Sequence, residues 1–319
     1  MPMQPPITLL ADLGGTNARF ALFDGTAIGP IARLPVADYA DLRTAIATFL
    51  HTQQPPRAPV RAVLAIAGPV ANGRATFTNA AWVADTAELT AQFRFERVDL
   101  INDFAAQAWA LPHLQPADLH RLGAGKALPG APMAVLGPGT GLGVAAFVPT
   151  RGGGFAISTE GGHVTLPSTS AREDALIAHL RGERGHVSAE GVLSGRGMMN
   201  LHAALVALDG GAHAPGSASE ITAAGLDGSC PVCRETLLVF GAMLGTVAGD
   251  LALTFGARGG VFIAGGIAPR IASLLARSAF RTNFEAKGRF RDYLAEIPTA
   301  IVLHSDPAFV GLSALARES

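Results

Sequence analysis

Two glycine-rich segments of the chain have the residue types that surround phosphate groups in proteins. Residues 12–17 read Asp-Leu-Gly-Gly-Thr-Asn, and residues 137–143 read Gly-Pro-Gly-Thr-Gly-Leu-Gly. Glycines let the backbone come close to a phosphate, so that successive N–H groups point at its oxygens, and each threonine adds a hydroxyl donor. One such segment is equally typical of a tight hairpin turn. Two of them, each expected between strands, could hold one triphosphate from both sides of a cleft.

Other residues extend this interpretation to a nucleotide with its metal ion. A third glycine pair, Gly265-Gly266, follows an expected strand and precedes a helix, where a nucleotide could lie against the backbone. Asp12 cannot bind an anion directly, but its carboxylate can hold Mg²⁺ through water, and Mg²⁺ normally accompanies ATP. The sequence has neither the P-loop pattern nor a Gly-x-Gly-x-x-Gly signature after its first strand. It therefore belongs to neither of those nucleotide-binding classes.

An amide and a carboxylate, Asn102 and Asp103, follow the expected strand 98–101 and precede an expected helix. Ligand sites in α/β sheets favour this carboxyl edge. A carboxylate there can accept the proton of an attacking hydroxyl while the neighbouring amide holds the substrate, and one aspartate base is a common part of phosphoryl transfer. Taken alone, capping of the helix by Asp103 is the better explanation.

Polar residues at later positions suit a polyol. Glu160 and His163 stand three residues apart in a glycine-flanked segment that follows neither helical nor strand periodicity. They could bind two hydroxyls of a sugar, whereas a metal site lacks an obvious third ligand. Glu190 is uninformative by itself, because a solvated glutamate at a helix start explains it.

The composition limits the class of protein. Of the 319 residues, 49% are hydrophobic and 15% are charged, which is enough for a sizeable core and argues against disorder. A chain of this length suggests about two domains. The net charge of −1 gives no sign of a nucleic-acid or membrane partner. The N-terminus lacks a signal peptide, and we take the apolar stretch 133–148 as the longest, too short and broken to span a bilayer, so we expect a cytoplasmic protein.

The chain has two cysteines, Cys230 and Cys233, in the order Cys-Pro-Val-Cys. They are too few for a secreted disulfide framework, and a zinc site would need two further ligands. We expect a reduced pair at the start of a helix, with metal binding or redox use as the less favoured alternatives.

The order of the expected elements indicates an α/β protein. Hairpins with glycine-rich turns over 7–23 and 134–148, one in each half, suggest two related α/β domains that face each other. An early helix is expected over 38–52 with Asp38 as its cap, and strongly helical segments follow at 171–181, 196–208 and 232–255.

These segments together resemble the bacterial glucokinase family. The resemblance rests on Asp-Leu-Gly-Gly-Thr-Asn-Ala-Arg at 12–19, Ile-Asn-Asp-Phe at 101–104, Leu-Gly-Pro-Gly-Thr-Gly-Leu-Gly at 136–143, Ser-Thr-Glu-Gly-Gly-His at 158–163, Ser-Ala-Glu at 188–190, Ile-Ala-Gly-Gly-Ile at 263–267 and Lys-Gly-Arg-Phe at 287–290. It implies an α/β, two-domain actin-like (ribonuclease-H-like) ATPase fold with an interdomain cleft. The small domain would combine residues 1–112 with 304–319, and the large domain would be 113–303.

The resemblance also implies a glucokinase that forms glucose 6-phosphate from glucose and ATP, with Mg²⁺, as a homodimer. Asp103 would be the base that activates the sugar 6-hydroxyl, and Asp12 would hold Mg²⁺ through water. The other substrate-binding residues would be Asn102, Glu160, His163, Glu190, Asn79 and Gly137. ATP would be bound by Ala11, Asp12, Leu13, Gly14, Gly15, Thr16, Gly139, Thr140, Gly141, Gly265 and Gly266.

Several alternatives stay open at the level of sequence. The acceptor could be another hexose or an amino sugar, and the donor could be ADP or polyphosphate. A sugar sensor without catalysis has no need for Asp103, and an actin- or chaperone-like ATPase has no need for Glu160 and His163. A related repressor and sugar-kinase family carries a cysteine-rich zinc motif beside its sugar-binding histidine; here Val-Thr-Leu-Pro follows His163, so no structural zinc is expected.

Overall fold

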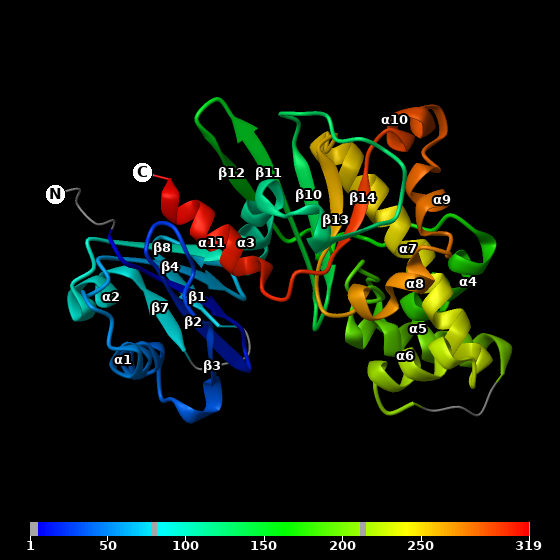
Figure 1. The fold of residues 1–319 in the computed structure, drawn as a ribbon. Helices are drawn as coiled ribbons and strands as arrows, with labels where there is room; N and C mark the ends of the chain where they lie inside the picture. The colour runs from blue at the N-terminus through cyan, green and yellow to red at the C-terminus, as the bar shows by residue number, and fades with distance from the viewer. Residues whose placement is uncertain (1–5, 78–81, 211–214, 319) are drawn as a thin grey trace. The chain divides into compact units, whose positions relative to one another are not determined.

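The structure is a computed structural model that describes residues 6–77, 82–210 and 215–318 (Figure 1). The chain divides into two compact units. Unit 1 comprises Met1–Leu114 and Ser305–Ser319, and unit 2 comprises Gln115–His304. The end of the chain therefore returns to the unit that contains its beginning.

Unit 1 is built on a five-stranded sheet of order β3-β2-β1-β4-β8. The strands are β1 (Thr8–Leu13), β2 (Asn17–Phe23), β3 (Ala32–Pro35), β4 (Arg61–Ile66) and β8 (Arg97–Asn102). The first three are antiparallel neighbours, whereas β4 and β8 run parallel to β1. Parallel strands need crossover connections, and α1 (Leu42–Gln53) and α2 (Thr86–Phe93) lie in those connections. A small second sheet joins β5 (Val70–Ala71), β6 (Arg74–Thr76) and β7 (Val83–Asp85).

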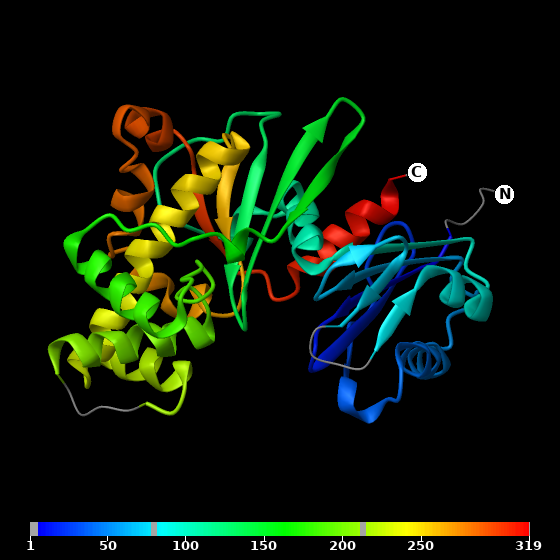
Figure 2. The same ribbon diagram turned by 180° about the vertical axis from the view of Figure 1, so that it is seen from behind.

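Both faces of the unit 1 sheet are covered. One face packs on α1 and α2 through a core that includes Leu9, Leu64 and Phe49. The other packs on α3 (Asp103–Ala110) and α11 (Pro307–Arg317) through Leu10 and Phe309, and α11 lies beside α3 in Figures 1 and 2. A sheet buried on both faces requires largely apolar strands, and β1 and β4 are apolar apart from Thr8 and Asp12 in β1 and Arg61 in β4.

Unit 2 has a six-stranded sheet of order β12-β11-β10-β13-β14-β9. The strands are β9 (Leu119–Arg121), β10 (Met133–Pro138), β11 (Leu142–Thr150), β12 (Gly153–Thr159), β13 (Gly260–Ile263) and β14 (Thr299–Val302). Strands β10 to β12 are antiparallel neighbours, and β13 and β14 run parallel to β10. Apart from the extra edge strand β9, this is the strand order and direction of unit 1, so the two units repeat one α/β design.

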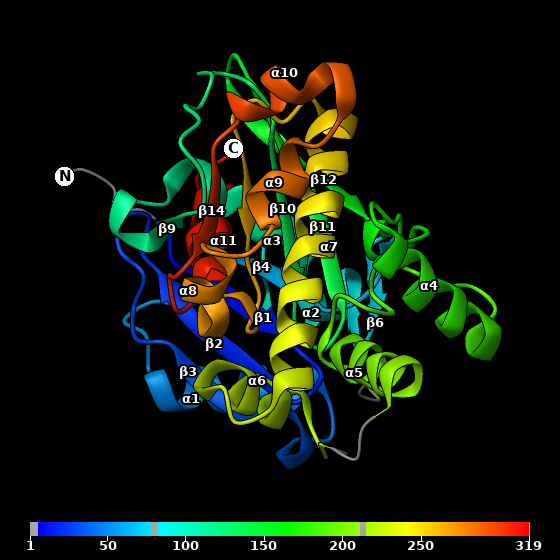
Figure 3. The ribbon, with the colours of Figure 1, turned by 90° about the vertical axis from the view of Figure 1, so that its right-hand side faces the viewer.

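The helices of unit 2 are concentrated between β12 and β13. They are α4 (Ala171–Arg184), α5 (Gly195–Asp209), α6 (Ala218–Asp227) and α7 (Pro231–Phe255), and shorter helices follow at α8 (Ala272–Leu275), α9 (Phe280–Glu285) and α10 (Arg291–Ala295). The helix α7 runs along the sheet in Figure 3 and packs on β10 and β13. By length and composition, α7 could cross a membrane. It is therefore a longer apolar stretch than 133–148, which was expected to be the longest. However, 67% of its apolar window is buried, as in a core helix.

The expected start of the first helix was wrong, and one helix was missed. The first helix begins at Leu42 and not near Asp38, because the side chain of Asp41 accepts a hydrogen bond from the Thr44 N–H at 2.7 Å and caps it. Val36–Asp38 forms a separate 3₁₀ turn. The helix α6 was not anticipated.

Candidate active site

The edge of the unit 1 sheet presents Asn102 and Asp103, where β8 ends and α3 begins. The Asn102 side-chain oxygen caps the helix, accepting from the N–H groups of Phe104 at 2.9 Å and Ala105 at 3.3 Å. Asp103 is the first residue of the helix, with one oxygen 2.9 Å from the Phe104 nitrogen. Because Asn102 is the cap, capping does not explain the aspartate. The Asn102 amide nitrogen has only a long contact, 3.4 Å, to the Gly68 carbonyl, so it is the group of Asn102 suited to meet a ligand.

The environment of Asp103 gives its carboxyl group a pKa that suits a general base near neutral pH. Its pKa is raised from 3.8 to about 6, chiefly by burial and also by the nearby carboxylate of Asp12, against smaller lowering by the Phe104 N–H. A base is most effective when its pKa lies near the working pH. Asp103 is then largely ionised at pH 7 and still basic enough to accept a proton.

Asp12 lies near the end of β1 and is held by a network of charges. In the antiparallel register it is opposite Arg19 of β2, and the two side chains form an ion pair. Arg19 also contacts Asp306 at 2.9 Å, and Arg33 of β3 contacts the same carboxylate at 2.9 Å. Burial raises the pKa of Asp12, whereas Arg19 lowers it. The chain thus places two arginines against two buried carboxylates, which keeps Asp12 in a fixed position.

The first glycine segment forms the turn between β1 and β2. The Gly14 N–H donates to the Asn17 carbonyl at 3.1 Å, and Thr16 is exposed. The side chains of Ala11 and Leu13 are fully buried in the core, so only the backbone of these two residues could meet a nucleotide. Gly14, Gly15 and Thr16 form the accessible part of the segment.

The second glycine segment, between β10 and β11, lies against the third. Gly265 adopts a left-handed backbone with φ of 78°, and a Cβ there would lie 2.5 Å from the Pro138 carbonyl oxygen. Only glycine fits this approach. The Gly139 N–H donates to the Gly141 carbonyl at 2.8 Å, and a Cβ on Gly139 would meet nothing within 4 Å. Unit 2 therefore joins two glycine turns at one place, with open space above Gly139; Gly137 is buried within β10, and Thr140 is exposed.

The carboxylate of Glu190 is tied to the second glycine segment. It accepts a hydrogen bond from the Leu142 N–H at 2.8 Å, and a Cβ on Gly141 would lie 2.4 Å from the same oxygen. The alternative explanation of Glu190 as a solvated residue at a helix start does not apply, because the residue is half-buried and α5 begins at Gly195. Glu190 lies in the preceding turn, where its carbonyl accepts from the hydroxyl of Ser194, the α5 cap.

Glu160 and His163 lie next to Glu190. The Glu190 N–H donates to the Gly162 carbonyl at 2.8 Å, and the His163 N–H donates to the Glu160 carbonyl at 2.9 Å. The side chains of Glu160 and His163 are exposed and lie close together, with Glu160 Oε2 and His163 Nε2 3.9 Å apart. Three side chains that can each bind a hydroxyl thus gather beside a glycine turn. Asn79 lies outside the described residues.

The candidate residues form one group in each unit. Asp12, Asn102 and Asp103 belong to unit 1, and Glu160, His163 and Glu190 belong to unit 2 with the glycines 137–141 and 265–266. The sequence did not predict that Arg19 and Asp306 would form a charge network with Asp12. Arg19 stands inside the motif 12–19, whereas nothing in the sequence links Asp306 to it, because α11 brings it in from the far end of the chain.

Hard oxygen donors are what Mg²⁺ prefers, and the oxygens of Asp12 meet that requirement within unit 1. A divalent cation would also offset the charge of Asp12, which raises the pKa of Asp103. The residues present therefore fit a magnesium ion that comes with a nucleotide.

The chain resembles known proteins over nearly its full length. A family model described as Glucokinase matches residues 9–319. A protein of Paramagnetospirillum magneticum named glucokinase is 48% identical over 315 residues, which is 98% of each chain. The crystal structure of a glucokinase from an Antarctic psychrotroph superposes with a TM-score of 0.91 at 38% identity and covers 99% of this chain and 100% of that one. A glucokinase of the ROK family from Streptomyces griseus, solved with glucose and AMPPNP, shares the fold at 21% identity and a TM-score of 0.65, covering 98% of this chain and 100% of that one.

Proposed function

The chain belongs to the glucokinase family, and we propose that it transfers the terminal phosphoryl group of ATP to the 6-hydroxyl of glucose, with Asp103 as the base. The fold is the actin-like α/β fold of the sugar kinases. The observation that carries the role of Asp103 is its place: it stands at the carboxyl edge of the sheet, its pKa is raised to about 6, and Asn102 performs the capping.

Asp103 acts on the proton of the sugar. Its carboxylate accepts the proton of the 6-hydroxyl as the oxygen bonds to the γ-phosphorus of ATP, and the bond from that phosphorus to the β,γ-bridging oxygen breaks, releasing ADP. Asp103 then returns its proton to solvent. In phosphoryl transfer most catalysis comes from positioning and charge stabilisation, and a general base contributes about 10²–10⁴-fold in rate.

The remaining candidates divide between sugar and nucleotide. We assign the other hydroxyls of glucose to Asn102, Glu160, His163 and Glu190, with the segments at Asn79 and Gly137 beside them. The glycine turns at 14–16, 139–141 and 265–266 receive the nucleotide through backbone N–H groups. Asp12 would hold Mg²⁺, and that ion would neutralise charge on the phosphates.

The assembly and location of the protein are part of the same proposal. The small domain 1–112 with 304–319 supplies the base, and the large domain 113–303 supplies Glu160, His163 and Glu190. We place the enzyme in the cytoplasm as a homodimer. The helical segment 171–255 supports a dimer interface because it exposes several large apolar side chains, namely Leu208, Leu226, Leu238 and Leu253. Light scattering after gel filtration tests the dimer, and a monomer at micromolar concentration would contradict it.

A panel of acceptors and donors tests the substrate. Sugar phosphate formation is measured with glucose, mannose, fructose and N-acetylglucosamine, each with ATP, ADP or polyphosphate. The proposal predicts fast turnover for glucose with ATP. Preferred turnover of another sugar or donor would replace the substrate assignment, and binding of glucose with no turnover under any donor would make the protein a sensor.

A further inference from the structure

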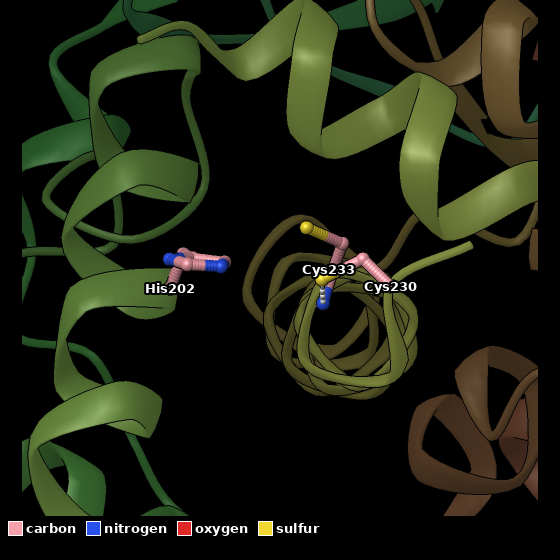
Figure 4. Close-up of side chains that lie close together, drawn as sticks. All are labelled: His202, Cys230 and Cys233. Atoms are coloured by element: carbon pink, nitrogen blue, oxygen red, sulfur yellow. Dashed lines mark hydrogen bonds between the residues drawn. The ribbon is translucent and has the colours of Figure 1, made fainter. Parts of the chain in front are cut away.

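A cluster of two cysteines and one histidine lies inside unit 2, away from the residues assigned to glucose and ATP. The ligand atoms of His202, Cys230 and Cys233 all lie within 4.8 Å of one another, and all three residues are buried. Figure 4 shows the imidazole of His202 pointing from α5 toward the sulfurs at the start of α7. We propose that these three side chains bind one zinc ion, which joins α5 to α7.

The donor set is one that zinc uses. Zinc is held by cysteine sulfur at about 2.3 Å and histidine nitrogen at about 2.0–2.1 Å, and two cysteines with one histidine are a known protein donor set with an open fourth position. In a tetrahedral site, atoms bound at such distances lie about 3.4–3.8 Å apart. The upper limit of the observed spacing, 4.8 Å, exceeds this tetrahedral spacing by about 1 Å, a difference that rotation of the three side chains would close.

The backbone around Cys230 fixes the position of its sulfur. Its sulfur accepts a hydrogen bond from the Cys233 N–H at 3.3 Å, and Cys230 is the residue that caps α7. That sulfur therefore lies at the N-terminal end of a 25-residue helix, next to a backbone N–H. The spacing Cys-x-x-Cys brings the second sulfur to the same side, as in structural zinc sites.

Charge and burial favour a divalent ion over a redox role. Cys230 is 7% exposed, Cys233 is 0% exposed and His202 is 3% exposed, among apolar neighbours that include Met198 and Leu201. Thiol–disulfide exchange requires access for an attacking thiol, which this burial prevents. Two thiolates with a neutral imidazole and Zn²⁺ sum to zero charge, so the loaded site can be buried without an unbalanced charge.

The proposed zinc site is connected through α5 to the second glycine segment, 137–143. The first residue of α5, Gly195, donates its N–H to the Gly139 carbonyl at 2.8 Å, so the helix that carries His202 also supports the second glycine segment. A metal that fixes α5 against α7 would fix that support. Its main effect is on the stability of unit 2, and the proposal does not depend on the kinase assignment.

Cobalt provides the direct test on the full-length protein. The reduced, chelator-treated chain is titrated with Co²⁺ and followed by absorption. We expect one equivalent to bind with the intense sulfur-to-cobalt and tetrahedral bands, and Zn²⁺ to displace it. Cys230→Ser and Cys233→Ser should each lose most of the sulfur band. His202→Gln should bind more than about 100-fold more weakly, beyond the 10–100-fold typical of outer-shell partners.

The control variant is His179→Gln, which removes an α4 histidine paired with Glu183 on the surface and should leave cobalt binding unchanged. Equal binding by the cysteine variants, or no stoichiometric binding to the wild type, would overturn the proposal. So would a Cys230–Cys233 disulfide that forms readily while no metal binds.

Two further measurements on the wild type remove any dependence on how the variants fold. Zinc should raise the midpoint of thermal unfolding, because a ligand that binds only the folded chain stabilises it. X-ray absorption at the zinc edge should show two sulfur neighbours and one nitrogen neighbour. A shell made only of oxygen and nitrogen would overturn the proposal.

Discussion

Replacing Asp103 by asparagine should make the protein more stable at neutral pH. In the folded chain the pKa of Asp103 is raised from 3.8 to about 6, chiefly by burial. The unfolded chain therefore loses this proton before the folded chain does, and wild-type stability falls as the pH rises from about 4 to about 6. A shift of about two units corresponds to about 3 kcal/mol. Asparagine does not titrate, so the variant avoids this loss.

The gain should grow with pH. Integration of the same two pKa values gives a difference between variant and wild type of about 1.5 kcal/mol at pH 5 and about 3 kcal/mol at pH 8. Urea unfolding at the two pH values, followed by circular dichroism and extrapolated to water, measures the difference. Asparagine can keep the hydrogen bond from the Phe104 N–H, so the comparison isolates the charge.

Asp41→Asn is the matched control, because Asp41 is also an aspartate at a helix start in unit 1. Hydrogen bonds from Thr44 lower the pKa of Asp41, so its contribution is present at neutral pH and is lost as the pH falls. This variant should show no gain at pH 8. If Asp103→Asn gives no gain in stability, or the same gain at both pH values, then burial does not raise the pKa of Asp103. The reasoning about Asp103 as the base would then fail.

Three further predictions concern the same site. The value of kcat/KM for glucose should fall with decreasing pH below about 6, because Asp103 must be ionised to accept a proton; a pH–rate profile measures this. Arg19→Met should lower the free energy of unfolding by about 3 kcal/mol, measured by urea unfolding, because it leaves the buried Asp12 carboxylate without its arginine, whereas Asp306 keeps Arg33. Gly141→Ala should raise the KM for glucose about tenfold with little loss of stability, because the new methyl group displaces the Glu190 carboxylate and its hydrogen bond; steady-state kinetics and a thermal melt measure the two effects.

Control variants separate these effects from general damage. Arg43→Met removes an exposed arginine paired with Asp41, and Gly152→Ala adds a methyl group where nothing lies within 4 Å. Both should leave kinetics and unfolding unchanged. A flat pH profile down to pH 5, an Arg19 variant as stable as wild type, or an unchanged KM in the Gly141 variant would each contradict the corresponding argument.

Local sequence signals predicted much of the fold, because they act through the backbone. Apolar runs and glycine turns marked both hairpins, and the buried strands β1 and β10 appeared as largely apolar segments. The start of α1 was misplaced because Asp38 and Asp41 are equally good caps by type. Only the hydrogen bond to Thr44 decides between them, and that bond depends on the path of the chain out of β3.

The same limit applied to the site. A carboxylate at a helix start looks like a cap, and only the structure shows that Asn102 caps α3 and leaves Asp103 available. Glu190 depends on a hydrogen bond to Leu142, and Asp12 on a network that ends at Asp306. Such partners are far apart in the sequence and are brought together by packing, so no motif predicts them. His202 meets the cysteine pair for the same reason, because α5 and α7 pack together.

The kinetics of Asp103→Asn test the central claim most directly. Turnover of glucose with Mg²⁺-ATP and glucose affinity by calorimetry are measured on the same preparations of wild type and variant. The account predicts that kcat falls by about 10²–10⁴-fold while glucose still binds with its wild-type affinity. A variant that keeps its wild-type kcat, or a folded variant that loses turnover only because it no longer binds glucose, would contradict the role of Asp103 as the base.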